Sequence, residues 1–233
     1  MKITIEYSNK NISIQKLDAI IVFIFEDSDL TGSGLNSLPN GIKKNLNTSL
    51  RLKVFSGKKD TFQQLLSGHE NIPQILAIGV GKKNEINSEI LRRAAGKAGK
   101  ILTSMKVKLF GLAVTSHLQN KSEINIGQVL VEGITLGAYK FNKYKESQDD
   151  KSKFRSIKIL CCDPDNITNR KDLKTGKIRA DATNLARDLG NTPANDLKPK
   201  DLASTARNIA KQHKMNCTVL EEKQMKTLGM EML

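Results

Sequence analysis

The sequence predicts an α/β layer fold with a largely parallel sheet, and two observations carry that prediction. Apolar runs of strand length recur along the first part of the chain, and a helix-length amphipathic segment separates two of them. Unbroken apolar runs suit strands that are buried on both faces, and strands that alternate with helices are typical of a parallel sheet. Aliphatic side chains must fill the core, because hydrophobic residues make up 38% of the chain and aromatic residues only 4%.

Five strands are expected in the first 165 residues. Residues 1–7 alternate between polar and apolar side chains, which indicates a half-buried strand. The other four strands are the apolar runs at residues 17–25, 75–81, 106–114 and 156–162.

The sequence shows no sign of membrane insertion or secretion. None of the apolar runs approaches the roughly 18 residues that a membrane-spanning helix needs, and the N-terminus lacks the layout of a signal peptide. The three cysteines show no disulfide framework, so a cytoplasmic protein with no membrane partner is expected.

Helices are expected between and after these strands. The clearest begins at Ser88, a plausible N-cap, and keeps its apolar residues on one side as far as Leu102. A further helix is expected at residues 127–140, and a charged, solvated loop at 141–155. A third helix should run from about residue 177 to 189.

The chain changes character after Gly190, which is expected to be the C-cap glycine of the third helix. Pro199 suits the first position of a new helix. A short strand is expected at residues 217–220 and a helical turn or two at 221–228. These elements are too few to enclose a core of their own. The second unit is therefore expected to be incomplete, to pack on the first unit, or to continue in a longer parent chain.

Side chains suited to catalysis are scattered. His69, His117 and His213 form no metal-binding pair, and Cys161 and Cys162 lack the two-residue spacer that lets two thiolates share a zinc. Two glycine turns, at residues 31–34 and 79–83, follow strands and could cradle an anion, but neither matches a complete nucleotide-binding fingerprint. A tight turn between strand and helix is the simpler interpretation.

The best binding candidate is the basic face of the helix that begins at Ser88. The net charge of the chain is +14, and residues 51–110 hold twelve basic and four acidic residues. Such a face could neutralise phosphates of a nucleic acid, although a solvated helix face is the plainer alternative, and no aromatic side chains are interleaved to stack on bases. The candidate residues are Arg92, Arg93, Lys97 and Lys100.

Three groups of segments together resemble the cytosolic leucyl aminopeptidase family, which consists of two-metal exopeptidases. The similarity is persuasive from about residue 75 onward and covers the rest of the chain. The segments are residues 78–83 with 91–96, residues 131–145, and residues 184–195 with 198–199, 225–226 and 228–230.

The resemblance implies an N-terminal macro-like three-layer α/β domain with a mixed, largely parallel sheet (residues 1–165), a linker with a connecting helix (166–190) and the truncated start of a zinc-peptidase-like catalytic domain (191–233). It implies that the parent protein hydrolyses N-terminal residues from peptides with two divalent metals, zinc or manganese, and assembles as a homo-hexamer. The family motif Asn-Thr-Asp-Ala-Glu-Gly-Arg-Leu does not occur in this sequence. We therefore expect no catalytic or metal-binding residue, no bound metal and no peptidase activity in this chain alone.

Two other functions stay open. Some bacterial members of the family also bind DNA as regulators, so a nucleic-acid-binding module that uses the basic face is the main alternative. Binding of an ADP-ribose-type ligand by the macro-like domain rests on fold analogy alone.

Overall fold

The computed structural model describes residues 2–26, 37–105, 108–115, 118, 124–144, 156–162 and 168–230. The chain divides into two compact units, Met1–Asn184 and Leu185–Leu233, with the boundary inside a helix. The predicted glycine turn at residues 31–34, His117 and most of the predicted loop at 141–155 lie outside the described residues.

The first unit is built on a six-stranded sheet with the order β1-β6-β5-β2-β4-β3. Every neighbouring pair is parallel except β3 with β4, so the prediction of a mixed, largely parallel sheet is confirmed. The strands are β1 (Lys2–Ser8), β2 (Ala19–Phe25), β3 (Phe62–His69), β4 (Ile72–Gly81), β5 (Leu109–Ala113) and β6 (Ser156–Cys162).

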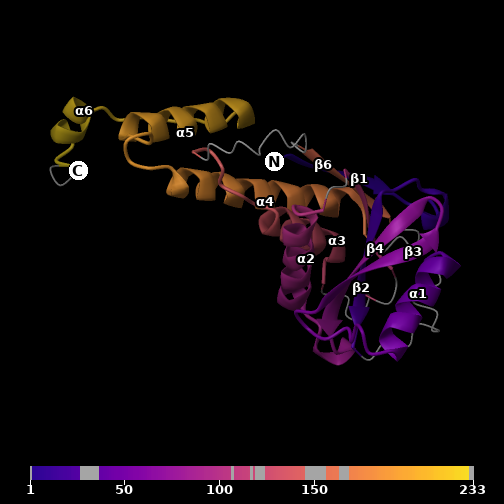
Figure 1. Cartoon of the computed structure of the whole chain (residues 1–233). Coiled ribbons are helices and arrows are strands. Elements are labelled where there is room, and N and C mark those ends of the chain that lie inside the picture. The colour runs from indigo at the N-terminus through magenta and orange to yellow at the C-terminus, as the bar shows by residue number, and fades with distance from the viewer. Residues whose placement is uncertain are drawn as a thin grey trace. The chain divides into compact units, whose positions relative to one another are not determined.

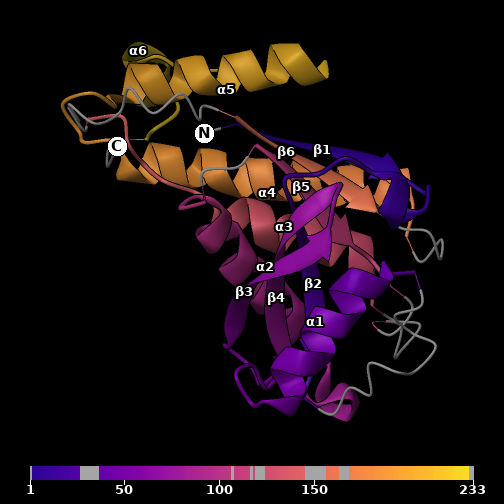
Figure 2. The ribbon, with the colours of Figure 1, turned by 45° about the vertical axis from the view of Figure 1, so that its right-hand side comes forward.

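Helices cover both faces of the sheet, because the strands bury apolar side chains in both directions. In β2, Ile21 and Phe23 pack with α2 (Ser88–Leu102) and α3 (Ile126–Gly137), whereas Ile20 and Val22 pack with α1 (Asn40–Arg51). Figure 1 and Figure 2 show α2 and α3 on one side of the sheet and α1 on the other. Short 3-10 helices lie at Ile12–Ile14 and Lys83–Glu85. The helices are α1 (Asn40–Arg51), α2 (Ser88–Leu102), α3 (Ile126–Gly137), α4 (Arg170–Asn191), α5 (Pro199–His213) and α6 (Glu222–Thr227).

Two elements of this unit, α1 and β3, were not predicted from the sequence. Helix α1 buries only Ile42, Leu46 and Ser49, so its apolar stripe is too thin to stand out in a polar sequence. Strand β3 is an edge strand whose apolar residues do not alternate, since Phe62 and Leu66 are exposed while Gln63 and Ser67 take more buried positions. Its register with β4 shifts between Leu66 and His69.

The prediction for the third helix was wrong at both ends. Helix α4 begins at Arg170 rather than near residue 177, because Leu173 and Gly176 are buried in the first unit. Gly190 lies inside the helix and is not a C-cap residue, since the helix continues to Asn191.

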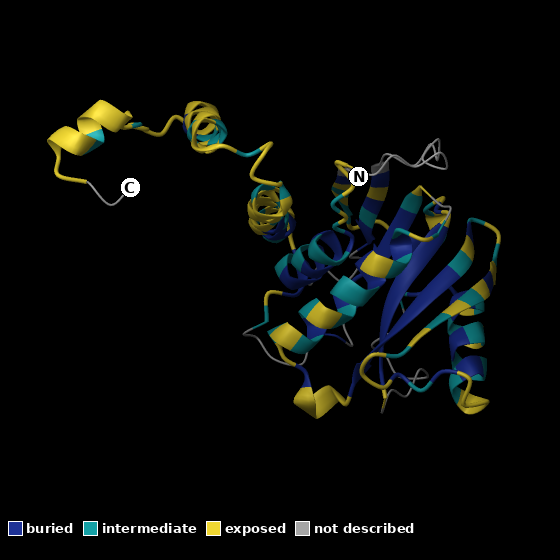
Figure 3. Ribbon diagram, turned by 60° about the vertical axis from the view of Figure 1, so that its left-hand side comes forward, coloured by how far each residue is buried: buried dark blue, intermediate teal, exposed yellow. Residues whose placement is uncertain are grey.

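The second unit has little buried surface of its own. Helix α5 begins at Pro199, as predicted, and α6 lies within the predicted helical segment. The strand predicted at residues 217–220 is wrong, because that segment joins no ladder among the described residues. A strand needs a neighbouring strand that pairs with its backbone N–H and C=O groups. The sequence pattern alone does not show whether such a neighbour is present. Figure 3 shows exposed residues along most of α5 and α6 and buried residues along the strands.

Among the helices of the described residues, none combines the length and the apolar character needed to pass through a bilayer.

Candidate functional site

The predicted basic face lies on α2, and a side-chain cap fixes where this helix begins. The Oδ1 atom of Asn87 accepts a hydrogen bond from the backbone N–H of Ile90 at 2.9 Å, so the N-cap is one residue before the predicted Ser88. Leu91, Ala95 and Leu102 then face the core. This burial turns the basic residues toward the flanks of the helix and toward solvent.

Both arginines of the face are engaged by carboxylates. Arg92 contacts Glu89 at 2.7 Å and reaches Glu132 on α3 at 3.2 Å, and Arg93 contacts Glu89 at 2.8 Å. Hydrogen bonds from Arg93 and Arg92 lower the pKa of Glu89. Burial opposes the charge of Arg92, but hydrogen bonds to Glu89 and Glu132 outweigh this effect and raise its pKa. These arginines therefore form ion pairs within α2, and Arg92 also joins α2 to α3.

The two lysines of the face have different surroundings. The Nζ atom of Lys97 donates to the backbone carbonyl oxygen of Asp60 and lies 5.5 Å from the centre of the Phe62 ring, in cation–π geometry. Lys100 is exposed in the last turn of α2. Arg93 and Lys97 line a cavity of about 220 Å³, whereas Arg92 and Lys100 do not.

The glycine turn at the end of β4 lies beside this cavity and has a steric explanation. A Cβ atom at Gly79 would meet the backbone carbonyl oxygen of Lys58 at 2.1 Å, and Gly81 has a φ of +80°. Both glycines thus allow the loop around Lys58 to pass close to the strand.

Nucleic-acid binding by this face stays a prediction. Glu89 and Glu132 compensate the charges of the arginines, and Lys97 is held by a backbone carbonyl. No observation on the described residues favours a phosphate backbone as the ligand.

Replacing Glu89 with glutamine is expected to reduce stability in a pH-dependent way. The pKa of Glu89 is lowered in the folded state, so its stabilising contribution is present above the unfolded pKa of 4.5 and is lost as the pH falls through the lowered value. Urea unfolding at pH 7 should show wild type more stable than Glu89→Gln, and the difference should shrink below pH 4.5. Glu70→Gln is the control, because Glu70 is an exposed turn residue with no ion pair among the described residues. A difference that does not change with pH would contradict the ion-pair interpretation.

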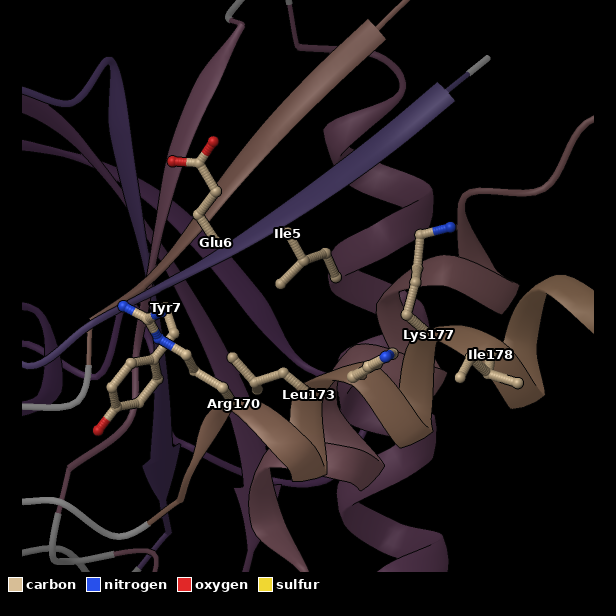
Figure 4. A pocket seen from close by; sticks show the side chains of 8 residues that line it. Ile5, Glu6, Tyr7, Arg170, Leu173, Lys177 and Ile178 are labelled. Atoms are coloured by element: carbon tan, nitrogen blue, oxygen red, sulfur yellow. The ribbon is translucent and has the colours of Figure 1, made fainter.

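A larger cavity, of about 530 Å³, lies between β1 and the first half of α4 (Figure 4). Sequence reasoning missed it, because the two elements are far apart in the chain and α4 was expected to begin later. We call it the β1–α4 groove. Its lining residues are Ile5, Glu6, Tyr7, Arg170, Leu173, Lys174, Lys177 and Ile178.

The described residues contain no group of three or more His, Cys, Asp or Glu side chains that could hold a metal ion. Cys161 and Cys162 are buried, and burial raises the pKa of the Cys162 thiol to about 12. A thiol with this pKa remains protonated at neutral pH and is a poor nucleophile or metal ligand. Cys217 is exposed.

Comparison with protein families finds two matches in chain order. Residues 21–148 match the N-terminal domain of the cytosol aminopeptidase family, and residues 184–233 match the catalytic domain of the same family. The first match alone covers more than half of the chain. This chain belongs to the cytosol aminopeptidase family.

Curated relatives of this cytosol aminopeptidase family member are similar over most of its length. It is 29% identical over 212 residues to a probable cytosol aminopeptidase of Aquifex aeolicus (strain VF5), covering 91% of this chain and 41% of the relative. It is 28% identical over 216 residues to a probable cytosol aminopeptidase of Alkaliphilus oremlandii (strain OhILAs), covering 91% and 43%. The chain therefore spans about two fifths of the length of these relatives.

Solved structures share the fold. A mutant tomato leucine aminopeptidase matches with a TM-score of 0.76 and 18% identity, over 98% of this chain and 46% of that chain. The bottromycin maturation enzyme BotP, solved also in complex with Mn, matches with a TM-score of 0.68 and 19% identity, over 91% and 41%. A cytosol aminopeptidase from Coxiella burnetii matches with a TM-score of 0.61 and 18% identity, over 96% and 41%.

Two of the segments that carry the family resemblance meet in the structure, where α2 crosses α3. A Cβ atom at Gly137 would lie 1.9 Å from the carbonyl oxygen of Gly96, and one at Gly133 would lie 2.3 Å from that of Arg92. The ion pair between Arg92 of α2 and Glu132 of α3 joins the same two helices. In this family member, these segments therefore serve close packing of two helices.

Proposed function

We propose that this chain is the N-terminal part of a metal-dependent aminopeptidase that removes N-terminal residues from peptides. One observation carries the proposal: the models of the N-terminal and catalytic domains of a single family match this chain in that order. Because the chain spans about two fifths of its relatives, the activity is assigned to the complete protein.

We further propose that the complete enzyme uses two divalent ions, zinc or manganese. Such a pair activates a water molecule and stabilises the charge that develops on the carbonyl oxygen. The metal requirement of the family and the Mn complex of BotP support this proposal. The described residues of this chain do not fit such a pair, because no three suitable side chains converge. Accordingly, no ligand is assigned here, and the chain alone is proposed to be inactive.

The proposed contribution of this chain is structural. Residues 1–165 would form the N-terminal domain, 166–190 a linker with the connecting helix, and 191–233 the first elements of the catalytic domain. The boundary between the compact units and the start of the catalytic-domain match both fall near residue 184, inside the proposed connecting segment. Family membership supports assembly of the parent as a hexamer in the cytoplasm.

The test compares two proteins with leucine p-nitroanilide and manganese. The purified 233-residue chain is expected to give no turnover above the blank. The product of the complete reading frame, obtained by sequencing the genome beyond the codon for Leu233, is expected to hydrolyse the substrate until EDTA is added. Turnover by the short chain that EDTA abolishes would overturn its proposed inactivity. A complete product that is folded and metal-loaded but inactive would overturn the assignment as an aminopeptidase.

A further inference from the structure

Strand β1 forms one edge of the sheet. It pairs in parallel with β6, from Lys2 opposite Ser156 to Ser8 opposite Cys162, and no described strand covers its other side. An edge strand directs alternate backbone N–H and C=O groups away from the sheet, where another extended segment can pair with them.

The β1–α4 groove lies beside this free edge. Successive side chains of a strand point to opposite faces, yet Ile5, Glu6 and Tyr7 all line the groove. Figure 4 shows Ile5 and Tyr7 directed toward α4 and Glu6 directed away from it. A cavity lined by three consecutive residues of a strand must pass along the strand's edge, so the backbone of β1 borders the groove.

The walls of the groove combine apolar surface with positive charge. Leu173 is buried, whereas Ile178 exposes 58% of its surface to solvent. Arg170 and Lys174 are exposed, and no carboxylate of the described residues lies within ion-pair distance of either. Lys177, by contrast, is held by Asp181 in the next turn of α4.

Glu6 does not cancel this positive charge. It contacts Lys158 of β6 at 2.9 Å and is directed away from α4. The rim formed by Arg170 and Lys174 therefore complements a negatively charged ligand, and the free edge of β1 complements an extended backbone.

We propose that the β1–α4 groove binds an extended, acidic peptide segment, which pairs with β1 as an additional strand. Apolar side chains of the peptide contact Ile178 and the half-buried Ile5, and its carboxylates face Arg170 and Lys174. Backbone pairing supplies affinity, and the charged rim selects acidic sequences. This binding is independent of peptide hydrolysis and goes beyond the proposed aminopeptidase function.

The probe is a fluorescein-labelled octapeptide of alternating valine and glutamate, amidated at its C-terminus, and the readout is fluorescence anisotropy with the full chain. Saturable binding that weakens with added salt is expected. The same peptide with lysine in place of glutamate should bind at least about tenfold more weakly. An N-methylated version, which cannot donate backbone hydrogen bonds, should also lose binding. Equal binding of either control peptide would overturn the proposal.

A pair of matched variants tests the rim. Arg170→Glu combined with Lys174→Glu should weaken binding of the valine–glutamate peptide by about tenfold or more. Lys171→Glu combined with Arg179→Glu reverses the same number of charges on exposed residues of α4 that do not line the groove. This control should change affinity much less, and circular dichroism should show that both variants are folded. Equal losses of peptide affinity in the two variants would show a nonspecific charge effect. They would contradict binding of the peptide carboxylates by Arg170 and Lys174.

Hydrogen exchange locates the peptide. Added peptide should protect backbone amides of β1, and β3, the other edge strand, should be unchanged. Protection confined to β3 or to α2 would overturn the proposed site. Self-association of the free chain through β1, seen by sedimentation together with protection of the β1 amides, would identify a second copy of the chain as the occupant. This result would overturn the proposal that an acidic peptide occupies the groove.

Discussion

Replacing Phe23 with alanine is expected to destabilise the first unit by about 3–5 kcal/mol. Phe23 lies in β2, between β4 and β5, and is fully buried among the apolar side chains under α2 and α3. Removal of the ring loses its transfer free energy and leaves a cavity that the flanking strands cannot close, because their ladders fix their spacing. The measurement is urea unfolding followed by circular dichroism.

The matched control is Phe62→Ala. Phe62 lies on the edge strand β3, is 46% exposed and contacts the ammonium group of Lys97. Its loss should cost about 1 kcal/mol or less, since little area is buried and an exposed cation–π contact is weak. Equal losses for the two substitutions would contradict the placement of β2 at the centre of the sheet.

Replacing Gly99 with alanine is expected to destabilise the first unit by about 2 kcal/mol. The new Cβ atom would lie 2.2 Å from the carbonyl oxygen of Ile134. This oxygen belongs to the backbone of α3, so relief requires the two helices to separate. Alanine favours a helix over glycine by about 1 kcal/mol, which offsets only part of this cost.

The control lies three residues earlier on the same helix. A Cβ atom at Gly96 would lie 3.6 Å from the carbonyl oxygen of Gly133, which is an ordinary contact. Gly96→Ala should therefore leave stability unchanged or raise it by up to about 1 kcal/mol. Urea unfolding of both variants decides the matter, and a Gly99→Ala protein as stable as Gly96→Ala would disprove the close packing of α2 on α3.

The candidate site shows the limits of reading charge from a sequence. The spacing of Arg92, Arg93, Lys97 and Lys100 correctly places all four residues on α2. It could not show that Glu132, forty positions away, lies against Arg92, nor that the backbone carbonyl of Asp60 accepts from Lys97. A charge pattern describes one helix, whereas the availability of a charge depends on what the fold brings beside it.

The sequence by itself determined the α/β class, the buried strands, helices α2 and α3, and the family. These follow from local periodicity and from short segments, both of which are properties of contiguous residues. Only the tertiary structure decided the antiparallel edge strand β3, the early start of α4, and the β1–α4 groove. Each of these depends on a contact between residues far apart in the chain. Leu173 and Ile178 line the groove beside β1 because α4 packs in the first unit, and no local pattern records that packing.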